Sequence, residues 1–348
     1  MQNVLITGGA GYCGSVLTSR LLNRGHKVTV YDNLWFGCHL PNHVNLCVVK
    51  GDIRDTEKLA SLFWKQDTII HLACIANDPS VELDAALTKQ INLDCFEPMV
   101  IAAKNSKHIK RFIYCSTSSV YGTSNRPEVT EESPCVPITL YNTYKAHCEP
   151  LLFKHASEDF TCIILRPATV AGYSPRQRLD LCVNILTNHA VNKGKITVFG
   201  GSQMRPNIHI EDLVDVYELL LTAPPNKVHK QIFNVTCHFD TISNWALLVK
   251  NTVEKLLPKK KIEIVTTPSD DPRSYKINAD KIFHVLGYKP KRTIELAVED
   301  LVRAFSNHLL PNSLEDPIYF DVETMKKMGV GTTPRVDPGY VTPAGAVL

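Results

Sequence analysis

Short apolar runs alternate with longer amphipathic stretches through the first two thirds of the chain. The runs are rich in β-branched residues and have the length of buried strands, whereas the segments between them repeat apolar residues with helical spacing. This alternation predicts an α/β fold built on a doubly wound parallel sheet. The predicted strands lie at residues 4–7, 27–31, 46–49, 68–71, 111–115 and 161–165.

Two of the predicted helices contain a proline. One helical stretch runs from about residue 81 to residue 103, and Pro98 is expected to kink or interrupt it. The other contains residues 140–145, and Pro150 is expected to kink its far end.

The first strand leads through a glycine-rich turn into a helix. Gly8, Gly11 and Gly14 allow the backbone to turn tightly and to approach a diphosphate at the helix N-terminus. Asp32 ends the second strand, where a carboxylate can accept both ribose hydroxyls and would repel a 2′-phosphate. The pattern therefore predicts a dinucleotide site that favours NAD over NADP, with Arg54 as the one nearby cation that could bind such a phosphate.

Later segments supply further candidate contacts to the dinucleotide. Residues 51–53 follow the third strand, where they would meet the adenine, and the small side chains of residues 72–74 follow the fourth. Asn92 could reach back towards the cofactor, although a capping or surface role is equally compatible with its position. The fifth strand opens into a cluster of hydroxyl side chains at residues 116–122, at the sheet edge where open α/β sheets place their chemistry.

The candidate catalytic pair is Tyr141 and Lys145. A separation of four residues in a helix places both side chains on one face. A neighbouring ammonium favours the phenolate and so lowers the tyrosine pKa. Bringing that pKa from about 10 to neutrality corresponds to about 4 kcal/mol, so a bound nicotinamide cation would have to contribute as well. The pair predicts a general base for a sugar hydroxyl that loses its hydride to the cofactor.

Composition narrows the class of protein. The 348 residues are 44% apolar and 21% charged, with a formal net charge of +3 and no basic stripe with interleaved aromatics, so no nucleic-acid partner is expected. No apolar run approaches the length of a membrane span, and no histidine spacing marks a metal site. The eleven cysteines form no Cys-x-x-Cys pair, and the chain enters a strand without a signal peptide. A reduced, cytoplasmic protein is therefore expected.

Together these motifs resemble the extended short-chain dehydrogenase/reductase superfamily, specifically its NAD-dependent nucleotide-sugar epimerase and dehydratase branch (UDP-glucose 4-epimerase-like). The resemblance covers residues 2 to about 304. It rests on motifs that follow one another at the family's distances, at residues 7–14, 32–34, 51–53, 71–73, 116–122, 141–145, 166–172, 205–212 and 286–290.

The resemblance implies roles for particular residues. Tyr141 would be the catalytic base, Lys145 would bind the nicotinamide ribose and lower the tyrosine pKa, and Thr117 would hydrogen-bond the reacting hydroxyl. The residues expected to bind NAD are Gly8, Gly11, Tyr12, Cys13, Gly14, Asp32, Asn33, Asp52, Ile53, Leu72, Ala73, Cys74, Asn92, Ser116, Tyr141, Lys145 and Pro167. Those expected to bind the nucleoside-diphosphate sugar are Thr117, Ser118, Thr169, Arg176, Asn184, Arg205 and Arg273.

The same motifs discriminate within the branch. Sugar-nucleotide 4,6-dehydratases have an acidic residue just after the threonine, where this chain has Ser118 and Ser119, which cannot do acid–base work near neutral pH. Thr169 stands where many 4-epimerases have asparagine, so the sugar is left open. Arg205 matches the family's diphosphate-binding arginine, whereas Arg176 could equally form a solvated surface pair with Arg178.

The predicted function is an NAD-dependent epimerase that acts through a transient keto-sugar. A nucleotide-sugar oxidoreductase or keto-sugar reductase is the main alternative; a 4,6-dehydratase and a non-catalytic, cofactor-sensing relative are less favoured. The family implies a homodimer formed through the helix near residues 81–103 and the helix of Tyr141.

The chain is expected to divide into two domains and a tail. Residues 1–170 and 208–239 would form the NAD-binding domain, and residues 171–207 and 240–310 a smaller α/β lobe that binds the nucleotide sugar. Residues 311–348 are expected to be an irregular extension, lying on the surface or reaching a neighbouring subunit.

Overall fold

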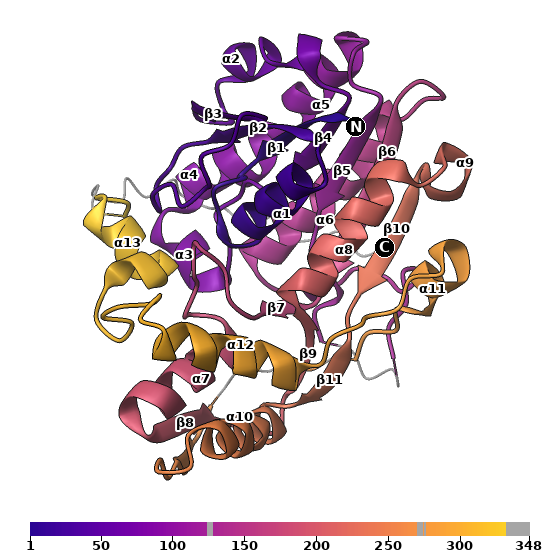
Figure 1. Ribbon diagram of the computed structural model, residues 1–348. Coiled ribbons are helices and arrows are strands. Elements are labelled where there is room, and N and C mark those ends of the chain that lie inside the picture. Colours follow the sequence, from indigo (N-terminus) through magenta and orange to yellow (C-terminus); the bar gives the residue numbers. More distant parts are fainter. Residues whose placement is uncertain (124–127, 270–273, 275, 332–348) are drawn as a thin grey trace.

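A seven-stranded parallel sheet forms the centre of the protein, as the computed structural model shows (Figure 1). The structure describes residues 1–123, 128–269, 274 and 276–331. The strand order β10-β6-β5-β4-β1-β2-β3 reverses beside β1, as in a doubly wound fold, so the predicted fold class is confirmed. The strands are β1 (Asn3–Thr7), β2 (Lys27–Asp32), β3 (Leu46–Lys50), β4 (Thr68–His71), β5 (Arg111–Cys115), β6 (Thr161–Pro167) and β10 (Gln231–Val235).

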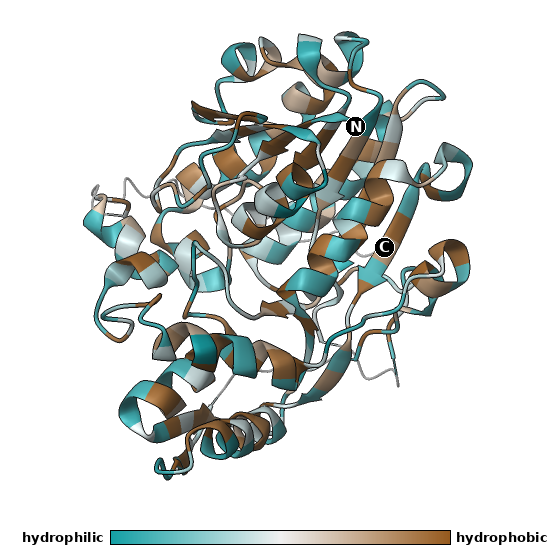
Figure 2. Ribbon diagram, viewed as in Figure 1, coloured by the Kyte–Doolittle hydropathy of each residue, from teal (hydrophilic) through white to brown (hydrophobic). Residues whose placement is uncertain are grey.

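Helices cover both faces of this sheet because alternate strand residues point to opposite sides. In β1, Val4 and Ile6 join the apolar core beneath α1 (Tyr12–Asn23) and α8 (Ile210–Thr222). Leu5 points the other way, into the core beneath α5 (Phe96–Asn105) and α6 (Leu140–His155). Figure 2 shows the apolar residues concentrated in the strands between these layers.

The helical stretch expected at residues 81–103 is broken twice, at Asp84 and at the π-helical turn that ends shortly before Pro98. It consists of α3 (Asp78–Leu83), α4 (Ala85–Lys89), a π-helical turn (Gln90–Asp94) and α5. The first break falls at Asp84, whose extended backbone and side-chain hydrogen bond to the Leu87 amide start a new helix. Pro98 lies in the first turn of α5, where a missing N–H costs no intrahelical bond. In α6 the helix continues past Pro150 to His155.

A smaller lobe follows β6. The central strand β9 (Met204–His209) pairs in parallel with β7 (Thr169–Ala171) and antiparallel with β11 (His238–Thr241). β8 (Lys195–Phe199) and β12 (Glu263–Thr267) form a separate parallel pair. The apolar core of the lobe lies among three helices, α7 (Cys182–Lys193), α10 (Ile242–Leu256) and α12 (Ile294–Ser306).

Short elements complete the described chain. They are α2 (Thr56–Ala60), the 3-10 turns η1 (Phe63–Lys65) and η3 (Ser118–Tyr121), α9 (Pro225–Val228), α11 (Asp280–Leu286), the 3-10 turn η4 (Pro317–Tyr319) and α13 (Asp321–Lys327). No helix in the part of the chain that the structure describes could cross a membrane.

The segment after residue 310 differs from the irregular extension expected from its composition. Up to residue 331 it contains η4 and α13, and it buries Tyr319, Asp321 and Met325. Helix α13, in yellow in Figure 1, packs beside α3 at the edge of the large sheet. Residues 332–348 lie outside the described part of the chain.

Candidate active site

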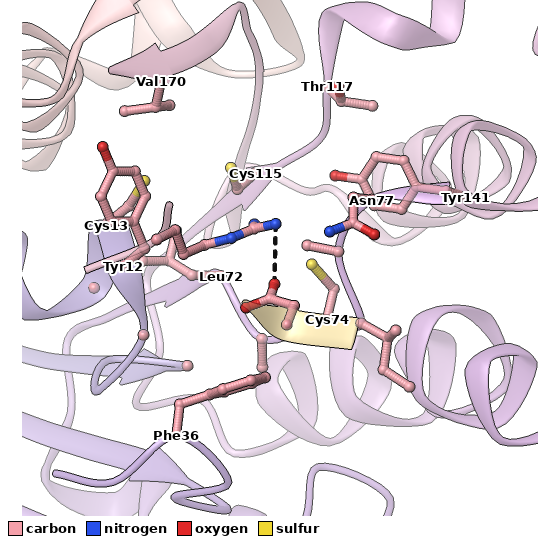
Figure 3. A pocket seen from close by; sticks show the side chains of 18 of the residues that line it. Tyr12, Cys13, Phe36, Leu72, Cys74, Asn77, Cys115, Thr117, Tyr141 and Val170 are labelled. Atoms are coloured by element: carbon pink, nitrogen blue, oxygen red, sulfur yellow. Dashed lines mark ion pairs between the residues drawn. The ribbon is translucent and has the colours of Figure 1, made fainter. Parts of the chain in front are cut away.

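A cavity of about 370 Å³ lies at the carboxyl edge of the large sheet, where β1, β2, β4, β5 and β6 end. Figure 3 shows Tyr141 and Thr117 on one side of it and Tyr12 and Cys13 on the other. Sixteen of the seventeen residues expected to bind NAD line this cavity, together with four of those expected to bind substrate: Thr117, Ser118, Thr169 and Arg176.

The glycine turn at one end of the cavity has the form of a diphosphate cradle. A Cβ at Gly8, where φ is +75°, would lie 2.6 Å from the Ala73 amide nitrogen, and one at Gly14 would lie 2.3 Å from the Gly8 carbonyl oxygen. These two glycines let β1, β4 and α1 pack together. At Gly11 the only close neighbour of such a Cβ is the Gly8 carbonyl oxygen, at 3.2 Å. Gly11 caps α1 without a side-chain hydrogen bond, so the first N–H groups of the helix can meet an anion.

The Asp32 carboxylate at the end of β2 is fixed by two backbone hydrogen bonds. One carboxylate oxygen accepts the Ala10 amide at 3.0 Å and the other accepts the Leu34 amide at 2.9 Å. Burial raises the pKa of Asp32, and the two backbone bonds together with the charge of Arg176 oppose that rise. Each oxygen can accept a further hydrogen bond, which suits the two hydroxyls of a ribose.

Arg54 does not line the cavity. Its guanidinium makes an ion pair with Asp52 at 2.6 Å and donates to Gln90 at 2.9 Å. This pairing lowers the pKa of Asp52. The one cation considered for a 2′-phosphate is therefore already engaged by a carboxylate.

Tyr141 and Lys145 lie one turn apart on α6 and both line the cavity. Lys145 is only 2% exposed, and its ammonium donates to the Cys115 carbonyl at 2.8 Å. Burial raises the pKa of Tyr141 well above its ordinary value, and Cys74 and Cys115 add to the rise, whereas the sequence had led us to expect a lowered pKa. Arg178 opposes that rise. Burial is therefore the dominant influence on this pKa.

Thr117 caps the 3-10 turn that follows β5. Its hydroxyl oxygen accepts the Ser119 amide at 3.2 Å, which leaves the hydroxyl proton free to be donated into the cavity. Ser116 is differently placed, because its hydroxyl donates to a Glu149 carboxylate oxygen at 2.6 Å. This hydrogen bond ties the loop after β5 to α6.

A buried polar network continues from Glu149. This carboxylate makes a two-pronged ion pair with Arg166, at 2.6 and 3.0 Å, and Arg166 also donates to the Tyr121 hydroxyl at 2.8 Å. Tyr121 in turn donates to Asn234 on β10 at 2.7 Å. The network fixes the Thr117 loop against β6 and β10, and sequence reasoning did not find it.

Three expected site residues that the structure describes do not line the cavity. Asn92 uses its whole amide on the backbone N–H and C=O of Ile75, both at 2.8 Å, and so shapes the loop after β4. Arg205 on β9 donates to the Met204 carbonyl at 3.0 Å, outside the cavity wall. Arg273 lies outside the described residues.

Asn184 is the third, and its place corrects the expected substrate contact. It is fully buried, accepts the Gly172 amide at 3.1 Å and donates to the Tyr12 hydroxyl at 3.0 Å and to the Arg178 carbonyl at 2.9 Å. All of its hydrogen-bonding groups therefore serve the protein, where they connect the lobe to α1.

Arg176 and Arg178 do not form a solvated surface pair. Both are buried in the cavity wall, where Arg178 pairs with Asp180 at 2.9 Å and both arginines reach Asp321. Burial acts to lower the pKa of Arg178, but the two carboxylates outweigh it and raise that pKa, so the guanidinium stays charged. Asp321 and Met325 of α13 complete the wall, and the motifs gave no signal for either.

The described residues hold no cluster of three or more His, Cys, Asp or Glu side chains that could bind a metal. The fold and cavity define an α/β protein with a dinucleotide cradle, a ribose carboxylate and a Tyr–Lys pair around one space.

The comparison with known proteins agrees with that class. The chain belongs to the NAD dependent epimerase/dehydratase family, whose profile it matches over residues 4–236. The family is NAD-dependent, and the cradle at Gly11 and the carboxylate of Asp32 fit that cofactor.

Individual relatives within the family differ in activity. The chain is 28% identical to UDP-glucose 4-epimerase of Lactobacillus helveticus over 83% of this chain and 92% of that enzyme. It is also 28% identical to UDP-glucuronic acid decarboxylase 4 of Arabidopsis thaliana over 90% of this chain and 70% of that one. The solved structure of MoeE5 in complex with UDP-glucose and NAD has the same fold, with a TM-score of 0.76, 21% identity, and coverage of 88% of this chain and 99% of that one.

Proposed function

We propose that the protein is an NAD-dependent epimerase that acts on a nucleoside-diphosphate sugar through a transient keto-sugar. The observation that carries the proposal is the loop after β5. There Thr117 faces the same cavity as Tyr141 and Lys145, and two serines occupy the positions where a dehydratase has its acid. The cavity can thus oxidise and reduce a sugar hydroxyl but has no acid at these positions for eliminating water.

Each residue of the trio has a distinct role. Tyr141 takes the proton of the sugar hydroxyl, Thr117 donates a hydrogen bond to the same oxygen, and Lys145 holds the nicotinamide ribose. NAD, when bound, accepts the hydride from that carbon and later returns it. Because burial raises the pKa of Tyr141, the phenol is neutral until positive charge beside it favours the phenolate.

The substrate side of the cavity is proposed to hold the diphosphate and the sugar. Thr169 and Ser118 line the space beside Thr117 and would contact the sugar. Arg205 remains a proposed diphosphate contact and Arg273 a proposed contact near the nucleotide, both on the strength of the resemblance alone. The chain is similar to a UDP-glucose 4-epimerase and to a UDP-glucuronic acid decarboxylase, so a UDP-sugar is the first substrate class to test.

A nucleotide-sugar oxidoreductase is the second candidate, because Tyr141, Lys145 and Thr117 serve one hydride transfer as well as two. The similarity to a UDP-glucuronic acid decarboxylase adds a related outcome, since loss of carbon dioxide can follow the same oxidation of a uronic acid. These reactions differ in what happens to the keto-sugar and in whether the cofactor is returned unchanged.

The test is direct analysis of what the purified protein holds and makes. Mass spectrometry and absorbance after acid release would detect bound nucleotide, and one-to-one NAD supports a self-recycling enzyme. Proton NMR with UDP-glucose would show an epimeric sugar in the presence of the retained cofactor. With UDP-glucuronic acid, a pentose product would instead identify a decarboxylase. Net NADH formation with either substrate would identify an oxidoreductase and overturn the epimerase.

We further propose that the protein is a cytoplasmic homodimer joined through α5 and α6. Both helices present apolar side chains to solvent, with Ile101 39% exposed and Leu140 43% exposed. Light scattering after size exclusion would give the mass, and Ile101→Glu should shift a dimer towards the monomer. An unchanged monomeric mass in both proteins would overturn this part of the proposal.

A further inference from the structure

Helix α13 brings a carboxylate into the cavity from a distant part of the chain. Asp321 is its first residue, and one carboxylate oxygen lies 2.6 Å from the Arg176 guanidinium while the other lies 3.0 Å from that of Arg178. Asp321 bridges the two arginines, and its backbone amide donates to Asp180 at 3.3 Å.

The two arginines lie between the ribose end and the catalytic end of the cavity. Arg176 stacks on Phe36 at 4.0 Å, and its charge acts on both Asp32 and Cys13. Arg178 acts on Tyr12 and on Tyr141. A dinucleotide whose ribose meets Asp32 and whose nicotinamide lies near Tyr141 would carry its diphosphate past this pair.

Arg176 has an unused donor. Arg176 is only 3% exposed, yet its Nε–H has no hydrogen-bond partner among the described residues. A buried guanidinium N–H without an acceptor is costly, and a phosphate oxygen is an acceptor of matching charge and geometry. The two positive charges are balanced by Asp180 and Asp321, so the site can be held folded without an anion.

The helix that carries Asp321 is anchored at two points. Met325 packs into the core beneath the sheet, beside α3. The Asp321 amide donates to Asp180, which also accepts a hydrogen bond at 3.2 Å from Asn77, the residue before α3, whose φ is +66°. A left-handed backbone at a residue other than glycine is strained and is retained where surrounding contacts fix it.

We propose that Asp321 is a positioning residue for the cofactor: it holds the guanidiniums of Arg176 and Arg178 beside the α1 N-terminus as a clamp for the cofactor diphosphate. The inference rests on the family's use of NAD, and not on the epimerase assignment. In it the arginines contact the diphosphate, and Asp321 acts only through them.

The test measures binding of nucleotides to full-length protein freed of bound nucleotide, by calorimetric titration. Asp321→Asn keeps the shape of the side chain but removes its charge. It should weaken NAD and ADP-ribose about tenfold or more, because charge-assisted hydrogen bonds to the diphosphate lose their alignment. Adenosine, which has no phosphate, should bind within about twofold of wild type.

Four further variants separate positioning from folding. Glu323→Gln removes an exposed carboxylate from the same helix, where it pairs with Lys326, and should leave all three affinities unchanged. Arg176→Met should itself weaken NAD, and adding Asp321→Asn in that background should cost less than it does in wild type. Asp321→Glu should recover part of the lost affinity.

Three outcomes would overturn the proposal. Tighter NAD binding by Asp321→Asn would show that the carboxylate competes with the diphosphate. An equal loss for adenosine and NAD, or a fall in unfolding midpoint that accounts for the loss, would show a purely structural role. Unchanged affinity for all ligands would show no role. Because none of these readouts uses a sugar, failure of the epimerase proposal would leave the result unaffected.

Discussion

The two walls of the cavity are built in different ways. On the sheet side, the groups that line the cavity are backbone N–H groups, glycines and side chains at strand ends, each within a few residues of the strand that positions it. On the opposite side the wall is made of charged side chains, and the Arg176–Asp321 pair joins residues 145 positions apart. One wall follows from local geometry, and the other exists only after the chain has folded.

The difference explains what each wall can tolerate. A glycine turn is limited by steric contact, such as the 2.3 Å that would separate a Gly14 Cβ from the Gly8 carbonyl oxygen. A buried ion pair is limited by charge, because removing one partner leaves the other desolvated and uncompensated. The following four experiments test this contrast, from the largest expected effect to the smallest.

Replacing the proposed base, Tyr141 on α6, should have the largest effect. Tyr141→Phe should lower kcat for the nucleotide sugar by about 10²- to 10⁴-fold, because proton transfer loses its positioned base. NAD affinity, measured separately, should change little. Tyr173→Phe, a tyrosine of the lobe that does not line the cavity, is the matched control and should keep its activity within about twofold. Near-normal turnover by Tyr141→Phe would remove this residue from the chemistry.

The second largest effect is expected from disrupting the buried network behind the Thr117 loop. Arg166→Met leaves Glu149 without its partner in the core and should reduce the free energy of unfolding by about 3–5 kcal/mol. The double variant Glu149→Leu with Arg166→Met should lose less, because no charge is left unpaired. Urea denaturation of the three proteins measures this. A double variant as unstable as the single one would mean that shape, and not charge, holds the loop.

Acid should affect the two walls in different pH ranges. Burial lowers the pKa of His71, beside the glycine turn, to about 3, so the unfolded chain binds a proton that the folded chain excludes. His71 therefore contributes stability that is present above about pH 6.5 and falls by up to about 1.4 kcal/mol per pH unit below it. Asp180 contributes in the other range: although burial acts to raise its pKa, Arg178 lowers it overall, so this stability is lost only below about pH 4.

Comparison with His71→Asn isolates the first effect. The variant should lose less unfolding free energy than wild type when the pH is lowered from 6.5 to 5, by urea denaturation at each pH. Identical pH slopes for the two proteins would show that the acid sensitivity comes from other groups.

Asn184 gives the smallest expected effect and the sharpest contrast between the motif and the structure. Asn184→Leu leaves the Gly172 amide without its acceptor and the Arg178 carbonyl without its donor, so it should cost about 1–3 kcal/mol of stability. The Tyr12 hydroxyl loses one donor but still donates to the Gly172 carbonyl. KM for the nucleotide sugar should be nearly unchanged. A raised KM with unchanged stability would instead return Asn184 to the substrate contacts that the resemblance implied.

The sequence predicted the fold and the sheet-side wall well because their signals are local. Gly11 is recognisable from the strand before it and the helix after it, and Asp32 from its place at a strand end. The opposite wall was only partly predicted. Arg176 was a candidate, but nothing near Asp321 in sequence marks it as its partner.

Polar groups engaged inside the protein were the other source of error. Asn92 and Asn184 are of a residue type that often contacts ligands. Only the structure shows that their side-chain amides are hydrogen-bonded to backbone groups and to a tyrosine hydroxyl. The rise of the Tyr141 pKa on burial was also not foreseen, since burial cannot be read from a spacing of four residues.

The distant origin of Asp321 also sets an order of events during synthesis. The glycine turn at Gly8 to Gly14 is made about three hundred residues before Asp321, which at ordinary ribosome speeds is roughly 15 to 60 s earlier. The parallel sheet can assemble in that interval, while one side of its cavity is still untranslated. A nascent chain would thus carry an accessible dinucleotide cradle before the arginines gain their carboxylate, which gives the cofactor an opportunity to enter ahead of the helix that encloses it.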